Sequence, residues 1–280
     1  MVVVTNLLSL THFELRLDKE IKTLWISPTG PSNLELTPGN VLELEQIWNW
    51  LTSHIEISAV VLQSPTGKFA SGANLTQIAQ MSLEELRAFQ ERLQRVIYAA
   101  FFLPQTIIYD IGEGAKDFAA ELALLADIRL ARNTSHLHFD HLQKGLVPSS
   151  GGIGLLSTLV GPFLVRNLCL SGHPLTADDL KNQGLVLELY SNRIERDQVM
   201  QGLLAQICAQ SPVARIQAKR AMLELVRKSF EEGLAVERNF GRAAHHLHDW
   251  KTGVQASLDG KRAEYLSAED VANKVRNIHA

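Results

Sequence analysis

Short β-like segments alternate with helical segments over the first two thirds of the chain. Residues 12–27 alternate apolar and polar side chains on both sides of a turn-like Asp18–Glu20, which predicts a β-hairpin. Residues 37–54 instead repeat their apolar positions with helical spacing. Residues 57–64 form a β-branched run that is typical of a strand buried on both faces.

The same alternation continues to about residue 190. A long amphipathic helix is predicted over residues 82–103, with Ser82 as N-cap and Glu85 completing a capping box. An apolar helix over residues 115–126 follows the strand at 105–111 and precedes the strand at 127–132. Strands that alternate with helices in this way predict an α/β fold.

After about Ser191 the pattern is helical, with almost no strand signal. Ser211 is suited to be an N-cap, and Pro212 to be the first residue of a helix. We therefore predict a core over residues 1–195 and an all-helical region over residues 196–280. Two interpretations of the second region stay open, because it can pack on a partner subunit or fold back on its own domain.

Composition excludes several classes of protein. The 280 residues are 46% hydrophobic and 20% charged, as in an ordinary globular chain, and the formal net charge of -3 gives no electrostatic case for a nucleic-acid or anionic-membrane partner. No apolar run has transmembrane length. Cys169 and Cys208 are isolated, and the first residues lack the features of a signal peptide. We expect a cytoplasmic protein.

Two glycine-bearing loops are the first places that suggest chemistry. Gly67 and Gly72 lie between a predicted strand and a helical turn near Ala73, and a second such turn precedes Phe118. Backbone N–H groups at both turns can hold an oxygen that carries negative charge. Glu121 shares a helix face with Phe118 and could transfer protons. The alternatives are ordinary turns and a solvated or arginine-paired glutamate.

The order of these segments resembles the enoyl-CoA hydratase/isomerase (crotonase) family over residues 13–266. The similarity lies in "AVVLQSPTGKFASGANL", "PQTIIYDIGEGAKDFAAELALLADIRLA" and "HLHFDHLQKGLVPSSGG". It implies a crotonase-like spiral of ββα repeats with a C-terminal helical trimerisation region, assembled as a homotrimer or a hexamer. It also implies an acyl-CoA thioester as ligand, a place in fatty acid metabolism, and no cofactor apart from the coenzyme A of the substrate.

By position, the resemblance assigns the enolate oxygen to the backbone N–H groups of Ala73 and Phe118, and the first hydratase glutamate to Glu121. The family's triple glycine is Asp117-Phe118-Ala119 here, so we expect both larger side chains to turn away from the site. An anionic carboxylate beside an enolate would be unfavourable.

The second hydratase glutamate aligns with His141, beside Asp140. Histidine can do acid–base work near neutral pH, although a structural role for His141 stays open. The cluster with His136 and His138 also suggests a metal, but we expect none.

Basic residues for the coenzyme A phosphates are fewer than in the family. The loop "SPTGPSN" has none, so Lys68, or Lys261 and Arg262, would supply the positive charge. We expect the ligand to be bound by Lys68, Ser71, Gly72 and Lys261.

Three functions fit these observations. The first is a hydratase-like lyase that uses Glu121 with His141, and the sequence favours it. The second is an isomerase with a single acid–base group, although the family's usual isomerase acid aligns with His141. The third is a non-catalytic crotonase-fold protein that binds an acyl-CoA or another protein.

Overall fold

The computed structural model describes residues 2–3, 8–30, 33–64, 67–245, 248–267 and 269–272. Its main sheet has seven strands in the order β1-β2-β3-β5-β7-β9-β12. Neighbouring strands from β3 onward are parallel, whereas β1, β2 and β3 pair antiparallel. The strand bounds are β1 Val2–Val3, β2 Phe13–Asp18, β3 Thr23–Pro28, β5 Ala59–Leu62, β7 Thr106–Asp110, β9 Ile128–Arg132 and β12 Glu188–Tyr190.

Local patterns account for the first part of this sheet. The predicted hairpin is confirmed, because Phe13 of β2 pairs with Pro28 of β3 and Asp18 pairs with Thr23. All four residues of β5 are buried, as expected for a strand covered on both faces. Side chains on one face of this sheet join the main core, while Ala59 and Val61 face a second, smaller core.

Two smaller sheets extend from this layer and position the candidate site. One pairs β4 with β6 in parallel, and the other has the order β11-β10-β8. Because β6 ends at Ala73 and β8 ends directly before a helix that starts at Asp117, both sheets deliver backbone N–H groups to the same region. The bounds are β4 Asn33–Leu36, β6 Lys68–Ala73, β8 Ala115–Lys116, β10 His136–His138 and β11 Leu175–Thr176.

Helices cover the sheets, and their ends follow the capping rules. Ser82 and Glu85 form the predicted capping box, and Ser211 caps a helix whose first residue is Pro212. The helix predicted over residues 115–126 is shorter, because Ala115 joins strand β8 and the helix ends at Ala123. The bounds are α1 Pro38–Leu51, α2 Leu75–Gln80, α3 Leu83–Ala100, α4 Asp117–Ala123, η1 His141–Lys144, α5 Gly154–Val160, α6 Pro162–Ser171 and α7 Ala177–Asn182.

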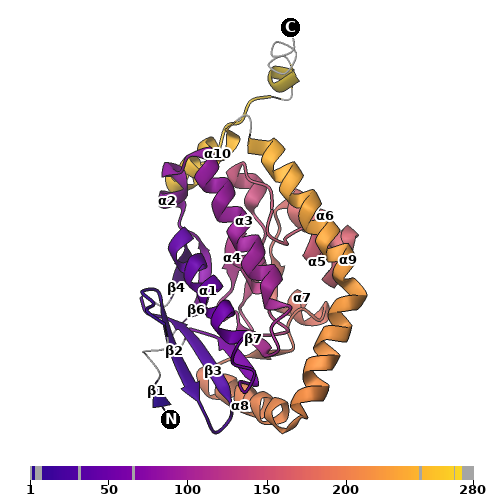
Figure 1. Cartoon of the computed structure of the whole chain (residues 1–280). Coiled ribbons are helices and arrows are strands. Elements are labelled where there is room, and N and C mark those ends of the chain that lie inside the picture. Colours follow the sequence, from indigo (N-terminus) through magenta and orange to yellow (C-terminus); the bar gives the residue numbers. More distant parts are fainter. Residues whose placement is uncertain are drawn as a thin grey trace.

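The C-terminal helices are α8 Arg193–Ala209, α9 Pro212–Ala244 and α10 Asp249–Leu258. Figure 1 shows α9 running along one side of the molecule, from the end that holds α8 to the end that holds α10. Gly233 of α9 lies so close to Gly154 of α5 that a Cβ atom on Gly233 would be 2.8 Å from the Cα atom of Gly154. The two helices therefore touch backbone to backbone.

Helix α8 covers the smaller core. Met200, Leu204 and Ile207 of α8 pack with Val61 and Ile108 of the main sheet. Among the described residues, no helix is long and apolar enough to span a membrane.

Candidate active site

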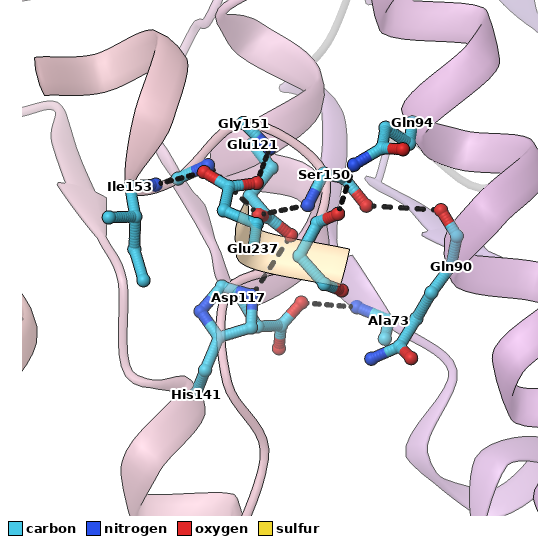
Figure 2. Close-up of polar contacts among 12 residues, drawn as sticks. Ala73, Gln90, Gln94, Asp117, Glu121, His141, Ser150, Gly151, Ile153 and Glu237 are labelled. Atoms are coloured by element: carbon cyan, nitrogen blue, oxygen red, sulfur yellow. Dashed lines mark hydrogen bonds and ion pairs between the residues drawn. The ribbon is translucent and has the colours of Figure 1, made fainter. Parts of the chain in front are cut away.

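The backbone N–H of Ala73, the first predicted oxyanion donor, is already hydrogen-bonded to a side chain. It donates to Oδ1 of Asp117 at 2.7 Å, from the end of β6 to the start of α4 (Figure 2). The expectation that the Asp117 carboxylate turns away from the site is therefore wrong. A carboxylate occupies the position at which the resemblance places the oxygen of a thioester.

Local backbone geometry and a cation explain the orientation of Asp117. Its φ angle is 43°, in the left-handed region that glycine adopts more readily. The ammonium group of Lys144 lies 3.3 Å from Oδ2 of Asp117 and also binds Asp140. Burial raises the pKa of Asp117, while the charge of Lys144 lowers it. The inward carboxylate is thus fully buried yet paired with a charge of opposite sign.

Glu121 lies one helical turn further along α4 and has no accessible surface. Its Oε1 accepts the backbone N–H groups of Ser150 at 2.8 Å and Gly152 at 3.0 Å. Its Oε2 lies 3.2 Å from Nε2 of His141. The structure therefore brings together the two predicted acid–base residues, and it also gives Glu121 two backbone donors that the sequence did not predict.

His141 and Phe118 close the remaining space beside Glu121. Both are fully buried, and their rings meet edge to face with centroids 5.1 Å apart. The ring of Phe118 also meets the ring of Phe89 of α3 edge to face, with centroids 5.4 Å apart. Because Glu121 and His141 touch directly and expose no surface, a water molecule does not fit between them in this arrangement.

Glu237 of α9 is a site residue that sequence reasoning missed. It accepts the backbone N–H groups of Gly151 and Ile153, each at 2.7 Å (Figure 2). It also accepts that of Gly154 at the start of α5. Burial, together with the charge of nearby Glu121, raises its pKa from 4.5 to about 8.

A signal for Glu237 is present in the sequence. Glu237 falls on the buried face of α9 that Phe230, Leu234 and Gly241 share at spacings of three and four residues. An acid on an otherwise apolar helix face needs buried donors.

Of the four residues predicted to bind coenzyme A, Lys68, Ser71 and Gly72 lie on β6, whereas Lys261 lies in a different part of the molecule. Lys261 lines a cavity of about 540 Å³ between η1 and the segment after α10, together with Lys144 and Arg262. Ser71 lines a different cavity of about 490 Å³, and its hydroxyl donates to the carbonyl of Leu34 at 3.2 Å.

The other two, Gly72 and Lys68, lie on β6 in the two-stranded sheet, as Ser71 does. A Cβ atom at Gly72 would be 3.1 Å from Oδ2 of Asp117, so this glycine leaves room for the inward carboxylate. Lys68 stands near His136, and after burial it is the second cause that lowers the pKa of that histidine.

The histidine cluster is divided among different partners. Nε2 of His138 contacts the carbonyl of Gly172 at 2.7 Å, while His141 faces Glu121. Within the described ranges, no three His, Cys, Asp or Glu side chains are grouped so that they could hold a metal ion.

Comparison with known proteins agrees with the architecture and the order of these elements. The enoyl-CoA hydratase/isomerase family model matches residues 32–267. The chain is 27% identical to the 2,3-dehydroadipyl-CoA hydratase of Escherichia coli over 75% of this chain and 81% of that protein. It is 24% identical to the short-chain-enoyl-CoA hydratase of Clostridium acetobutylicum over 89% of this chain and 95% of that protein.

A crystal structure of an enoyl-CoA hydratase from Mycobacterium avium subsp. paratuberculosis superimposes with a TM-score of 0.81 at 18% identity, over 92% of this chain and all of that one. The predicted α/β fold, a crotonase-like spiral with a C-terminal helical region, is confirmed by this likeness. The chain belongs to the enoyl-CoA hydratase/isomerase family.

Proposed function

We propose that this chain is a non-catalytic member of its family, which binds a coenzyme A thioester while its own side chains keep the enolate site closed. The observation that carries the proposal is the hydrogen bond from the Ala73 N–H to the Asp117 carboxylate, 2.7 Å long and without solvent access at Asp117.

Catalysis through an enolate needs the Ala73 N–H to donate to the enolate oxygen, not to Asp117. The enolate oxygen of a thioester gains its stabilisation from backbone donors that point at it. Here the donor at Ala73 serves an acid, and placing a second negative oxygen beside that acid would be electrostatically unfavourable. Opening the site would require Asp117 to leave both Ala73 and the ammonium group of Lys144.

The acid–base pair of Glu121 and His141 is also closed, in this case to a catalytic water molecule. A hydratase must hold a water molecule between its catalytic groups, but Oε2 of Glu121 and Nε2 of His141 are 3.2 Å apart and both residues are fully buried. Oε1 of Glu121 meanwhile accepts two backbone N–H groups. In this arrangement Glu121 supports the loop that contains Ser150 and Gly152.

The cavity between η1 and the segment after α10 supports the binding part of the proposal. Lys261 and Arg262 give it two cationic side chains, while Lys144, which also lines it, is paired with Asp140 and Asp117. Such a cavity suits the phosphate groups of coenzyme A. Its volume of about 540 Å³ is within the range of small-molecule sites.

The test separates binding from turnover. We expect purified protein to bind acetyl-CoA in a calorimetric titration, and to leave the enoyl absorbance of a short 2-enoyl-CoA unchanged. Replacing both cations (Lys261→Gln with Arg262→Gln) should weaken binding about tenfold or more, since a charged hydrogen bond contributes roughly 1.5–3 kcal/mol. Lys228→Gln, on an exposed part of α9, is the matched control. Turnover of the 2-enoyl-CoA that Glu121→Gln abolishes would overturn the non-catalytic assignment.

A hydratase-like lyase is the second candidate, because Glu121 and His141, two groups that can transfer protons, lie side by side; they would have to separate to admit a water molecule. In that case Asp117 rotates outward when the thioester binds, and the thioester oxygen accepts the backbone N–H groups of Ala73 and Phe118. Water then adds its oxygen to C3 of the enoyl group and a proton to C2, with Glu121 and His141 moving the protons. A rate that falls with both Glu121→Gln and His141→Ala would support this candidate. No observation in the site favours an isomerase.

We further propose that the protein assembles as a homotrimer or a dimer of trimers through its C-terminal region. Several large apolar side chains of α6 and α9 are exposed in the single chain: Phe163, Leu170, Met222, Leu225, Val236 and Phe240. Exposed apolar surface on this scale is typical of an interaction face. Its partner is a second copy of the chain under this proposal.

A further inference from the structure

A small cavity lies between α3 and the last third of α9, and no predicted site residue lines it. Its volume is about 10 Å³, which is enough for one water-sized occupant. We call it the α3–α9 niche. It is lined by Arg87, Gln90, Glu91, Gln94, Ser149, Arg238, Gly241 and Arg242.

Two buried polar side chains of the niche have no partner. Gln90 of α3 and Ser149 each expose only 5% of their surface. Within the described ranges, neither Nε2 of Gln90 nor Oγ of Ser149 has a hydrogen-bond partner. The amide end of Gln90 points away from Ser150, whose hydroxyl donates to the Gln90 carbonyl (Figure 2). Ser149 faces α9, since a Cβ atom at Gly241 would be 3.4 Å from its own Cβ atom. Such buried groups are costly unless an occupant completes their hydrogen bonding.

Every unpartnered group of the niche can donate a hydrogen bond. Nε of Arg87 is the third buried atom of the lining that has no partner in the described part of the chain. The Arg87 and Gln90 nitrogens can only donate, whereas a serine hydroxyl can donate or accept. A water molecule would bring two hydrogens of its own, with only the serine oxygen among these groups to accept them. An anion accepts from all three groups, so the donor set favours an anion over water.

The charges of the lining also favour an anion. Three arginines stand against one acid, Glu91, and that acid is paired with Arg242. Arg87 donates to the backbone carbonyl of Arg242 at 3.4 Å, and Arg238 donates to Oε1 of Gln94 at 3.2 Å. Among the described residues, neither Arg87 nor Arg238 forms an ion pair. Arg87 is half-buried and Arg238 is exposed at the rim, so two positive charges border the niche without an acid to balance them.

From these donors, these charges and this volume we infer that the α3–α9 niche binds one small monovalent anion of the size of a halide. The anion accepts the N–H groups of Arg87 and Gln90 and the hydroxyl of Ser149. Arg238 balances its charge from the rim. The bound anion holds α9 against α3, beside the loop that donates two N–H groups to Glu121. The inference does not depend on the proposed function, because no residue of the niche takes part in it.

Anion titrations of the full chain test this inference. Thermal melts are recorded in sodium chloride and in sodium gluconate at equal ionic strength, because gluconate is too large for the niche. We expect chloride to raise the Tm saturably, by about 3–5 °C at roughly ten times its Kd, and bromide to do the same. Gluconate should give no saturable rise. A crystal soaked in bromide should show an anomalous scattering peak within hydrogen-bond distance of Nε2 of Gln90.

Variants locate the site. Gln90→Glu gives the niche a carboxylate that belongs to the chain itself, so chloride should no longer raise the Tm. Arg238→Gln removes a charge from the rim and should weaken chloride binding several-fold. Arg220→Gln, at an exposed position of the same helix and outside the lining, is the matched control and should leave the chloride response unchanged.

The outcomes decide the inference in either direction. A Tm that follows ionic strength but not the choice of anion would mean that the niche holds only water, and would overturn it. A full chloride response in Gln90→Glu, or an equal response in Arg238→Gln and Arg220→Gln, would do the same. If Gln90→Glu does not fold, the two arginine variants, whose positions are exposed, and the bromide peak decide the question.

Discussion

Asp117 and Glu237 are two buried carboxylates that accept backbone N–H groups beside the start of a short helix, but their charges are balanced differently. Asp117 accepts one N–H group and faces the ammonium group of Lys144. Glu237 accepts three N–H groups and, among the described residues, forms no ion pair. A cation balances the first acid, while the second depends on backbone dipoles and on its own protonation.

Because of this difference, the two acids have different roles: Asp117 affects ligand binding, and Glu237 affects the support of a loop. Asp117 occupies a position at which a ligand atom could bind, so removing it changes what the protein binds. Glu237 connects α9 to the loop at residues 151–154, so removing it changes whether that loop is held. The predictions below test this distinction.

The largest effect is expected for Glu237→Ala. Three backbone N–H groups, one buried and two part-buried, lose their acceptor, and each unsatisfied group costs about 1–3 kcal/mol, so we expect the free energy of unfolding to fall by about 3–5 kcal/mol. Urea denaturation measures it. Glu232→Ala, an exposed position on the same helix, should change it by less than about 0.5 kcal/mol. Equal effects of the two variants would contradict a supporting role for Glu237.

The pH dependence of stability should come in part from Glu237. Its pKa is about 8 in the folded protein against an ordinary 4.5, so the folded state binds more protons between these values. The free energy of unfolding should therefore be highest below about pH 5 and fall as the pH rises through about 8, by at most about 1.4 kcal/mol per pH unit from this group. Glu237→Gln should make this slope shallower in denaturation curves recorded across that range; an unchanged slope would assign it to other groups.

Asp117→Gly tests the closed oxyanion position. In the native protein acetyl-CoA and free coenzyme A should bind equally, because the thioester oxygen finds no free N–H group at Ala73. The glycine variant should bind acetyl-CoA about tenfold more tightly than coenzyme A, since one hydrogen bond contributes about 1 kcal/mol or somewhat more. Asp117→Asn is the matched control, because its side-chain oxygen can still accept the Ala73 N–H. A preference for acetyl-CoA in the native protein would show that Asp117 does not close the position.

The smallest effect on stability is expected on the outer face of α9. Leu225 exposes 86% of its surface, so Leu225→Ser should change the unfolding free energy of the single chain by less than about 0.5 kcal/mol. It should nonetheless shift the assembly toward smaller species in light scattering coupled to size-exclusion chromatography. An unchanged mass distribution would place the interface elsewhere.

Local patterns predicted most of the fold, because the signals for these elements lie within a few residues of one another. The capping box of Ser82 and Glu85, the alternation in β2 and β3, and the apolar run of β5 need no distant partner to be recognised. The family resemblance supplied the order of the remaining elements.

The orientation of Asp117 could not be predicted in this way. It depends on a positive φ angle and on Lys144, which comes from η1, a separate part of the chain. The residues that flank Asp117 in the sequence indicate neither its positive φ angle nor its contact with Lys144. The prediction that an acid avoids an oxyanion position failed because a buried cation reverses the electrostatic argument.

Contact between Glu121 and His141 was predicted from the aligned glutamate pair of the family, but the two backbone donors to Glu121 were not. They come from Ser150 and Gly152, in a loop without regular structure. Whether this pair transfers protons stays a prediction that the Glu121→Gln and His141→Ala variants test.

The backbone contact between Gly154 and Gly233 has a consequence for how the chain can be divided. The region after residue 195 supplies Glu237, which accepts three N–H groups of residues 151–154, and Gly233, which touches Gly154 of α5. A fragment ending at residue 195 would therefore leave three amides without their acceptor and Gly154 without its contact. We therefore expect such a fragment to be insoluble or unfolded when expressed alone. Even an added methyl group at position 233 should loosen α9 and, with it, the surroundings of a glutamate that lies more than a hundred residues earlier.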